Sequence, residues 1–188
     1  MQYRSLGRTE LSLSVFSLGT MRCLGSQQGM AATIERAIDL GINHLETAQG
    51  YGKSEVWLGT ALKTLGIARE QVVITTKIPP LPDRSSMAAA IARSLERLQV
   101  DYIDCLAIHG INQAEHFDWI QQDQGCMAAV HAAIAAGKIR HVGFSTHGSL
   151  ELILQTIATD QFSFINLHYY YFFQRHQSAI ELATQKGM

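Results

Sequence analysis

The sequence predicts an α/β fold of the (β/α)8 TIM-barrel type, incomplete here, with about six strand–helix units after a short N-terminal hairpin. Short apolar runs alternate with helical patterns six times along the 188 residues, which is typical of a parallel sheet covered by helices. Polar side chains follow directly after successive apolar runs, at Glu46, Lys77, His109 and Ser145. Barrels carry catalytic residues at the C-terminal ends of several strands, so this distribution favours a barrel.

The same alternation of strands and helices could instead form an open, doubly wound sheet. Such a sheet usually reveals a nucleotide site by a glycine-rich first turn of the form GxGxxG. The turn after the first expected strand reads Gly19-Thr-Met-Arg-Cys-Leu-Gly25 and does not match that form. The open sheet is therefore the weaker prediction.

The expected strands are short, apolar and often β-branched. The hairpin turns at Gly7-Arg-Thr-Glu10 and leads into a strand at Val15–Leu18. The other strands are expected at Asn43–Glu46, Gln71–Thr76, Tyr102–Ile108, His141–Phe144 and Phe164–Leu167.

The expected helices alternate with these strands and end at glycines. They are Met30–Leu40, Ser54–Leu65, Ser85–Leu98, Met127–Ala136, Leu150–Ala158 and Ser178–Lys186. Gly41, Gly66 and Gly137 stand where a helix should stop. Ser85 or Ser86 is expected to cap the third helix, because a serine side chain can accept from the free amides of a first turn.

The chain is short for a complete barrel, which normally needs about 250 residues. It ends at Met188, where a seventh strand would begin. We therefore expect one domain over residues 1–188, forming the N-terminal three-quarters of a longer barrel. An unclosed barrel would leave strands one and six as unpaired edges.

Composition excludes several classes of function. Lys and Arg number 15 against 16 Asp and Glu, for a net charge of −1, and the basic block of a nucleic-acid binder is missing. No apolar run is long enough to cross a membrane, and the first residues lack a signal-peptide core. The three cysteines are far apart and show no metal-site spacing. We expect a cytoplasmic protein with reduced thiols, without metal, membrane or nucleic-acid partner.

The most informative segment is Gly41–Gly59, which reads as a strand end, a polar turn and a helix start. It places Glu46 and Tyr51 five residues apart, and Lys77 and His109 end the next two strands. Consecutive strand ends face one another in a barrel, so these four side chains could share one pocket and protonate a carbonyl oxygen. The ordinary alternatives are a packed tyrosine, a solvated lysine, a capping carboxylate and a structural histidine.

These residues resemble the aldo-keto reductase superfamily. The similar segments are Gly41–Gly59, the opening Tyr3–Leu11 with Leu18-Gly19-Thr20, Thr75-Thr76-Lys77, Leu106–His109 and Gly143–His147. They follow the family's order along nearly the whole chain. Glu46-Thr-Ala…Tyr51-Gly, with His109-Gly-Ile-Asn112, is most similar to the subgroup whose longer members carry a C-terminal ferredoxin-like iron–sulfur region, which this sequence lacks.

The resemblance implies NADPH-dependent reduction of a small carbonyl substrate. Tyr51 would be the general acid, with Lys77, His109 and Glu46 as its catalytic partners. A free phenol has a pKa of about 10, and a neighbouring ammonium would stabilise the phenolate. The expected cofactor-binding residues are Gly19, Thr20 and Met21 after the first strand, with Ser145 and Asn166 for the nicotinamide carboxamide. Ser145 and Asn166 could instead cap the loops that follow them.

Three residues depart from the family pattern, one of them Asn43, near which an arginine or aspartate is often found. Glu46 replaces the commoner aspartate and is one methylene longer, so its contact with Lys77 is expected to be displaced. Thr146 replaces the asparagine that commonly helps hold the carboxamide. Two alternatives stay open. Glu46 leaves room for a nucleotide-binding regulatory protein with little turnover, as in family relatives that serve as channel subunits. The two βα units expected after Met188 leave room for an inactive truncated fragment.

The aromatic run Tyr169-Tyr-Tyr-Phe-Phe173 has two interpretations. It could pack a helix against the barrel, which is the commoner use of such a cluster, or it could form a wall for substrate or cofactor.

Overall fold

The computed structural model describes residues 1–23 and 25–188 of the chain. An antiparallel hairpin, β1 (Tyr3–Ser5) and β2 (Ser12–Ser14), precedes a six-stranded sheet. The sheet strands are β3 (Ser17–Gly19), β4 (His44–Glu46), β5 (Val73–Ile78), β6 (Ile103–His109), β7 (Ile139–Ser145) and β8 (Phe164–Asn166). They are all parallel and lie in sequential order, which confirms the predicted incomplete barrel.

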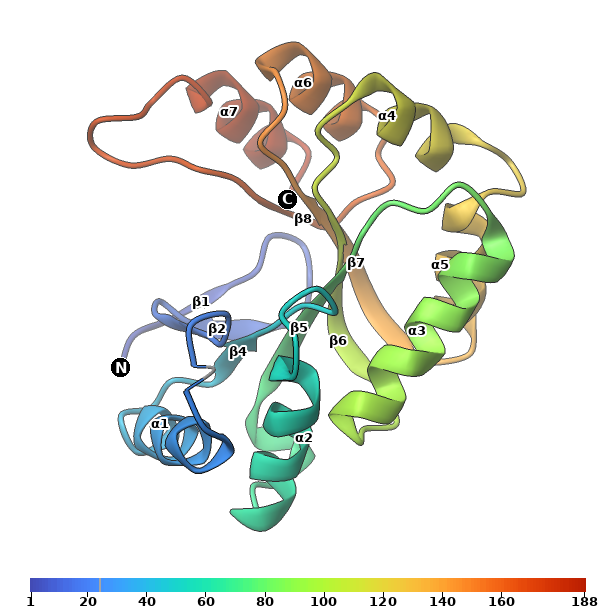
Figure 1. Cartoon of the computed structure of the whole chain (residues 1–188). Coiled ribbons are helices and arrows are strands. Elements are labelled where there is room, and N and C mark those ends of the chain that lie inside the picture. The colour runs from blue at the N-terminus through green and yellow to red at the C-terminus, as the bar shows by residue number, and fades with distance from the viewer. Residues whose placement is uncertain (24) are drawn as a thin grey trace.

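The helices lie on the outside of the curled sheet (Figure 1). They are α1 (Gln27–Asp39), α2 (Ser54–Thr64), α3 (Arg84–Leu98), α4 (Ala114–Gln121), α5 (Cys126–Ala135), α6 (Leu150–Ala158) and α7 (Gln177–Gln185), with a 3-10 turn η1 (Arg69–Gln71). Each βα unit returns the chain to the same end of the sheet, so all six strands end at one rim. We call this the C-terminal rim, and the opposite edge the N-terminal rim.

The boundaries differ from expectation where local hydrogen bonds decide them. Helix α1 begins at Gln27 because the Ser26 side chain accepts from Gly29 N. Asp83, and not Ser85 or Ser86, caps α3, and its carboxylate accepts from both serine hydroxyls.

Two further differences concern unpredicted or shifted elements. Helix α4 was not predicted, because only Ile120 of its eight residues is buried and its apolar pattern is weak. Gln71 belongs to η1, so β5 starts later than expected and continues through Lys77 to Ile78.

A large hydrophobic core fills the space between the sheet and the helices. At two glycines, neighbouring elements approach so closely that a side chain would not fit. A side-chain carbon added to Gly59 in α2 would lie 2.3 Å from the Leu98 carbonyl oxygen of α3. Gly143 in β7 is similarly restricted, since an added carbon would lie 2.5 Å from Phe164 of β8. Both glycines therefore permit contacts that any larger residue would prevent.

A smaller core inside the curl joins the hairpin to the sheet. Leu11 packs there with Cys105, Ala107 and Phe164. The hairpin turn also meets the end of the chain, because Arg8 N donates to the Gly187 carbonyl at 2.7 Å. The hairpin thus covers the N-terminal rim and leaves the C-terminal rim for a site.

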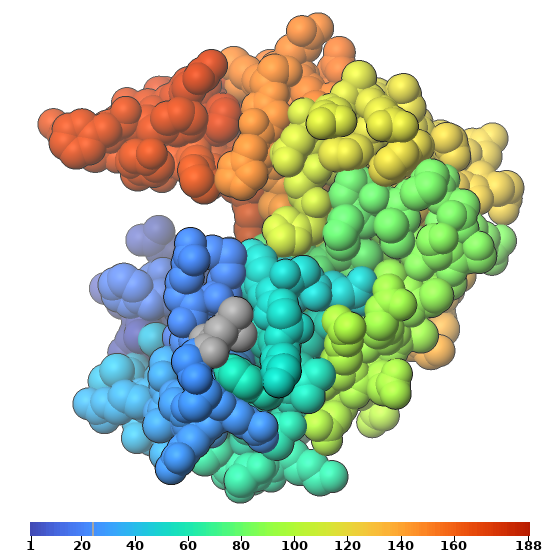
Figure 2. Space-filling model, in the orientation of Figure 1, coloured from blue at the N-terminus to red at the C-terminus, as the bar shows by residue number. Residues whose placement is uncertain are grey.

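The sheet is open on one side. Strands β3 and β8 stand at its two ends, each paired on one side, as predicted. Figure 2 shows a wide notch between the C-terminal segment, coloured red, and the N-terminal segment, coloured blue.

Candidate active site

The strand register gathers polar side chains at the C-terminal rim. Glu46 lies opposite Thr75 across β4 and β5, and Lys77 follows two residues later on the same face of β5. On the other side of the curl, His109, Ser145 and Asn166 lie in one row across β6, β7 and β8.

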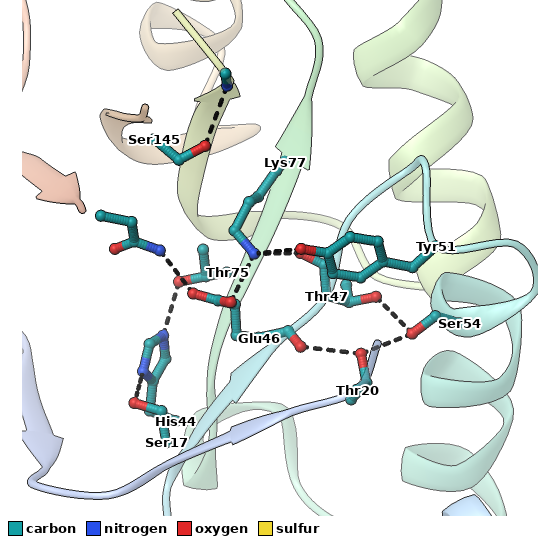
Figure 3. Close-up of polar contacts among 12 residues, drawn as sticks. Ser17, Thr20, His44, Glu46, Thr47, Tyr51, Ser54, Thr75, Lys77 and Ser145 are labelled. Atoms are coloured by element: carbon teal, nitrogen blue, oxygen red, sulfur yellow. Dashed lines mark hydrogen bonds and ion pairs between the residues drawn. The ribbon is translucent and has the colours of Figure 1, made fainter. Parts of the chain in front are cut away.

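Lys77 is the centre of this group (Figure 3). Its side chain is 4% exposed, and its ammonium donates to Glu46 Oε1 at 2.6 Å and to the Tyr51 hydroxyl oxygen at 3.3 Å. A third contact reaches the Thr47 carbonyl at 3.4 Å. A buried ammonium needs such partners, because its desolvation is otherwise very costly.

Tyr51 comes from the turn between β4 and α2 and points back over the sheet. Its amide donates to the Ala48 carbonyl and its own carbonyl accepts from Ser54 N, so the turn is fixed from both sides. The His109 ring meets the tyrosine ring edge-on, with ring centroids 5.7 Å apart. The structure therefore brings together the four residues predicted to be catalytic.

Glu46 keeps its contact with Lys77, so the expected displacement was wrong. The second carboxylate oxygen, Oε2, accepts from Asn166 Nδ2 at 2.7 Å. This partner comes from β8 across the interior of the curl, and the longer side chain reaches both it and the lysine.

Burial, with a contribution from the Lys77 charge, lowers the pKa of His109 below its ordinary value. The histidine is therefore neutral at pH 7, since an ordinary histidine pKa is about 6.5. A neutral imidazole carries one N–H donor and one acceptor nitrogen.

A cavity of about 160 Å³ opens above these groups. Its lining includes the four residues above and continues through Ser145, Thr146, His147, Asn166, Leu167 and His168. Larger hollows exist, for example one of about 450 Å³ between α1 and the first strands, but that one is lined mostly by apolar side chains such as Leu18, Leu40 and Ile42. The smaller cavity is the stronger candidate because several polar and titratable groups converge on it.

The two residues expected to hold a carboxamide both line this cavity. The Ser145 hydroxyl oxygen accepts from Gly110 N at 3.1 Å, which leaves its own hydrogen available to donate. Asn166 gives its Nδ2 to Glu46, which leaves Oδ1 as an acceptor.

The residues after β3 lie differently. Gly19, Thr20 and Met21 are outside the cavity lining given by the described residues. Thr20 is fully buried, its hydroxyl donates to the Glu46 carbonyl at 2.9 Å, and it also contacts Ser54 Oγ. Gly19 and Met21 are exposed.

The Thr146 hydroxyl is engaged in hydrogen bonds within the protein. Its hydroxyl donates to the Ile111 carbonyl at 2.7 Å and accepts from Gly148 N at 2.9 Å, and the residue is 2% exposed. It holds the loop after β7 in place.

His147 and His168 were not predicted as site residues, but both line the cavity, with perpendicular rings 4.7 Å apart. The signal that could have found them was position, since each follows a strand end within two residues.

The aromatic run after β8 does not pack a helix against the barrel, so the commoner of its two interpretations is wrong. Tyr171 and Phe172 are 82% and 90% exposed at the tip of a loop, and Tyr170 stacks on Phe173. The loop projects away from the sheet, so its tip has no core to enter (Figure 1).

A second polar layer lies directly below the group formed by Glu46, Tyr51, Lys77 and His109. His44 contacts Ser17 Oγ at 2.6 Å and Thr75 Oγ1 at 2.8 Å (Figure 3). Burial lowers the pKa of His44, although the Glu46 charge opposes this. A neutral His44 adds no positive charge beneath the Glu46–Lys77 pair.

The described residues contain neither a metal-binding cluster nor a membrane-spanning helix. Within residues 1–23 and 25–188, no three metal-ligating side chains come together in a way that could hold an ion. No helix of that part of the chain is both long and apolar enough to cross a bilayer.

Known proteins resemble this chain in sequence and in fold. Residues 16–188 match the model of the aldo/keto reductase family. The 6-dehydroglucose reductase of Novosphingobium aromaticivorans is 31% identical over 160 residues, covering 76% of this chain and 51% of that protein. A Schizosaccharomyces pombe protein named as a voltage-gated potassium channel subunit beta is 36% identical over 123 residues, covering 57% and 36%.

A solved structure matches the fold closely. An aldo-keto reductase from Bacillus halodurans, in its holo form, superposes with a TM-score of 0.85 at 25% identity, covering 100% of this chain and 64% of that one. The chain spans about half the length of the curated relatives that match it over about three-quarters of its own residues. By its sequence and its fold, the chain belongs to the aldo/keto reductase family.

Proposed function

We propose that the protein reduces an aldehyde or ketone to an alcohol with NADPH, and that Tyr51 is the general acid. The observation that carries the proposal is the position of Lys77 Nζ, which is within hydrogen-bonding reach of both the Tyr51 hydroxyl and the Glu46 carboxylate beneath a cavity. Family membership supports the reaction class.

The chemistry of the group follows from its contacts. When bound, a nicotinamide cofactor supplies the hydride for the carbonyl carbon. Tyr51 gives its proton to the carbonyl oxygen as negative charge develops there. Lys77 then stabilises the phenolate that remains, because its ammonium already donates to that oxygen. Glu46 holds the ammonium at this position.

His109 can orient the substrate. Because its pKa is lowered, the imidazole is neutral at pH 7 and does not compete as a cation with Lys77. One ring nitrogen can donate a hydrogen bond to the carbonyl oxygen, while the edge contact with Tyr51 keeps both rings near the same point.

The described residues fit the nicotinamide end of the cofactor. A carboxamide has one acceptor oxygen and one donor amine, and the cavity offers the Ser145 hydroxyl hydrogen and Asn166 Oδ1. A cavity of about 160 Å³ accommodates one ring and leaves the rest of a dinucleotide outside. The preference for NADPH over NADH follows from the family resemblance alone, and paired titrations with the two cofactors measure it.

The substitution Tyr51→Phe tests the proposal. Reduction of a reactive aldehyde should fall by about 10²–10⁴-fold, the usual contribution of one general acid. Cofactor affinity and the unfolding midpoint should stay nearly unchanged, because phenylalanine keeps the ring. Steady-state oxidation of NADPH and titration of cofactor fluorescence measure the two effects separately.

Tyr3→Phe is the matched control, since Tyr3 lies in the hairpin and donates only to the Gly41 carbonyl. Equal turnover in wild type and Tyr51→Phe would remove Tyr51 as the acid. Cofactor binding without any turnover in the wild type would favour the alternative, a nucleotide-binding regulatory protein.

A further inference from the structure

Glu46 connects two strands that are distant in the sheet. Its Oε1 binds Lys77 on the adjacent strand β5, and its Oε2 binds Asn166 on β8. Strand β8 stands at the open end of the sheet, four places from β4 in strand order. The contact with Asn166 therefore crosses the interior of the curl and joins the edge strand to the catalytic group.

The chemistry of the contact fixes the direction of the asparagine amide. An ionised carboxylate only accepts hydrogen bonds, so Nδ2 must face Glu46 and Oδ1 must face away. Nδ2 therefore binds Glu46, and Oδ1 remains available to accept a hydrogen bond in the cavity.

The length of the side chain at position 46 makes the double contact feasible. A side chain shorter by one methylene would withdraw the carboxylate by about 1.5 Å, one carbon–carbon bond. A contact of 2.7 Å lengthened by that much is no longer a hydrogen bond. An aspartate here could not hold both partners at their present positions.

We infer that Asn166 is a positioning residue, which holds the Glu46 carboxylate so that Oε1 stays on Lys77. The Glu46 side chain is 26% exposed to the cavity, whereas Lys77 is 4% exposed. Without Asn166, the three torsions of the glutamate are free to turn the carboxylate toward water. Glu46 and Asn166 form a matched pair, and β8 controls the catalytic group through it. This role rests on the proposed function, in which Lys77 supports the proton donor.

A double-mutant cycle tests the pairing. In the wild-type background, Asn166→Leu should lower kcat for aldehyde reduction by about tenfold, the size expected for loss of one hydrogen bond to a charged group. In the Glu46→Asp background the same substitution should change kcat little, because the shorter carboxylate no longer reaches Asn166. If the effects of Asn166→Leu and Glu46→Asp on kcat simply multiply in the double variant, the two residues act independently and the inference is overturned.

A second measurement does not depend on turnover. The acylation rate of Lys77 by acetic anhydride, followed by mass spectrometry, should rise by up to about tenfold in Asn166→Leu, since the lysine loses a fixed partner. Ser145→Ala is the matched control: Ser145 lines the same cavity but binds Gly110 N, so it should leave Lys77 acylation unchanged.

The outcomes are distinct. A wild-type rate of Lys77 acylation in Asn166→Leu would overturn the positioning role. Absence of reduction in every variant, with faster acylation in Asn166→Leu, would overturn the proposed function and support the positioning role.

Discussion

The two rims of the sheet each contain a buried ion pair, and they use it differently. At the N-terminal rim the Asp104 carboxylate is 2% exposed and accepts from Arg69, from Arg140 at 3.2 Å and from Ile74 N at 2.9 Å. The two guanidinium groups also lie over the Tyr102 ring, 4.0 and 4.2 Å from its centre.

The Glu46–Lys77 pair at the C-terminal rim faces a cavity instead. The Glu46 carboxylate is partly exposed to this cavity. Lys77 also donates to the hydroxyl of Tyr51, which lines the same cavity. The Asp104 carboxylate is held by groups of the protein alone, whereas the charges that face the cavity can act on a ligand. Barrels divide their rims in this way, with chemistry at the C-terminal ends of the strands.

The largest effect on stability should come from Asp104→Asn. It leaves two arginines without their carboxylate, and breaking a buried pair costs about 3–5 kcal/mol. Urea unfolding measures the change. Asp160→Asn is the matched control, because its pair with Lys186 is exposed and worth at most about 1 kcal/mol. A loss for Asp104→Asn no larger than for the control would remove the distinction between the rims.

Lys77→Met should affect stability less, by about 1 kcal/mol or below. The substitution removes a costly buried ammonium, and the remaining Glu46 carboxylate is hydrated by the cavity and bonded to Asn166. Reduction activity should be lost while the unfolding curve moves little. If Lys77→Met lowers the free energy of unfolding as much as Asp104→Asn does, the ion pairs at the two rims contribute equally to stability.

The smallest effect concerns His44 and pH. Burial lowers its pKa in the folded state, so on acidification the unfolded chain binds this proton at a higher pH than the folded chain does. Stability should therefore fall as the pH falls through the ordinary histidine pKa of about 6.5.

Urea unfolding of His44→Gln at both pH values tests this. The variant should lose less stability on acidification than the wild type. His109, whose pKa is also lowered, should retain its own contribution in that variant. His131→Gln, at an exposed position on α5, is the control and should keep the wild-type loss. An unchanged loss in His44→Gln would show that other groups set the pH dependence.

Much of the fold was predictable because the signals are local. The alternation of apolar runs with helical patterns gave the strand order, and strand-end positions predicted which side chains share the rim. Helix α4 escaped prediction because only one of its residues is buried. The cap at Asp83 was missed because three neighbouring polar residues compete for one role, and only the backbone geometry selects among them.

The sequence by itself determined the curled parallel sheet and the meeting of Glu46, Tyr51, Lys77 and His109, since strand period and order place them at one rim. Only the tertiary structure decided that Glu46 has a second partner across the sheet. The bond from Glu46 to Asn166 spans 120 residues and depends on how tightly the sheet curls. The burial of Thr20 and the exposure of Tyr171 depend likewise on which surfaces meet. Local pattern cannot fix such contacts, because they depend on distances between elements that are far apart in the chain.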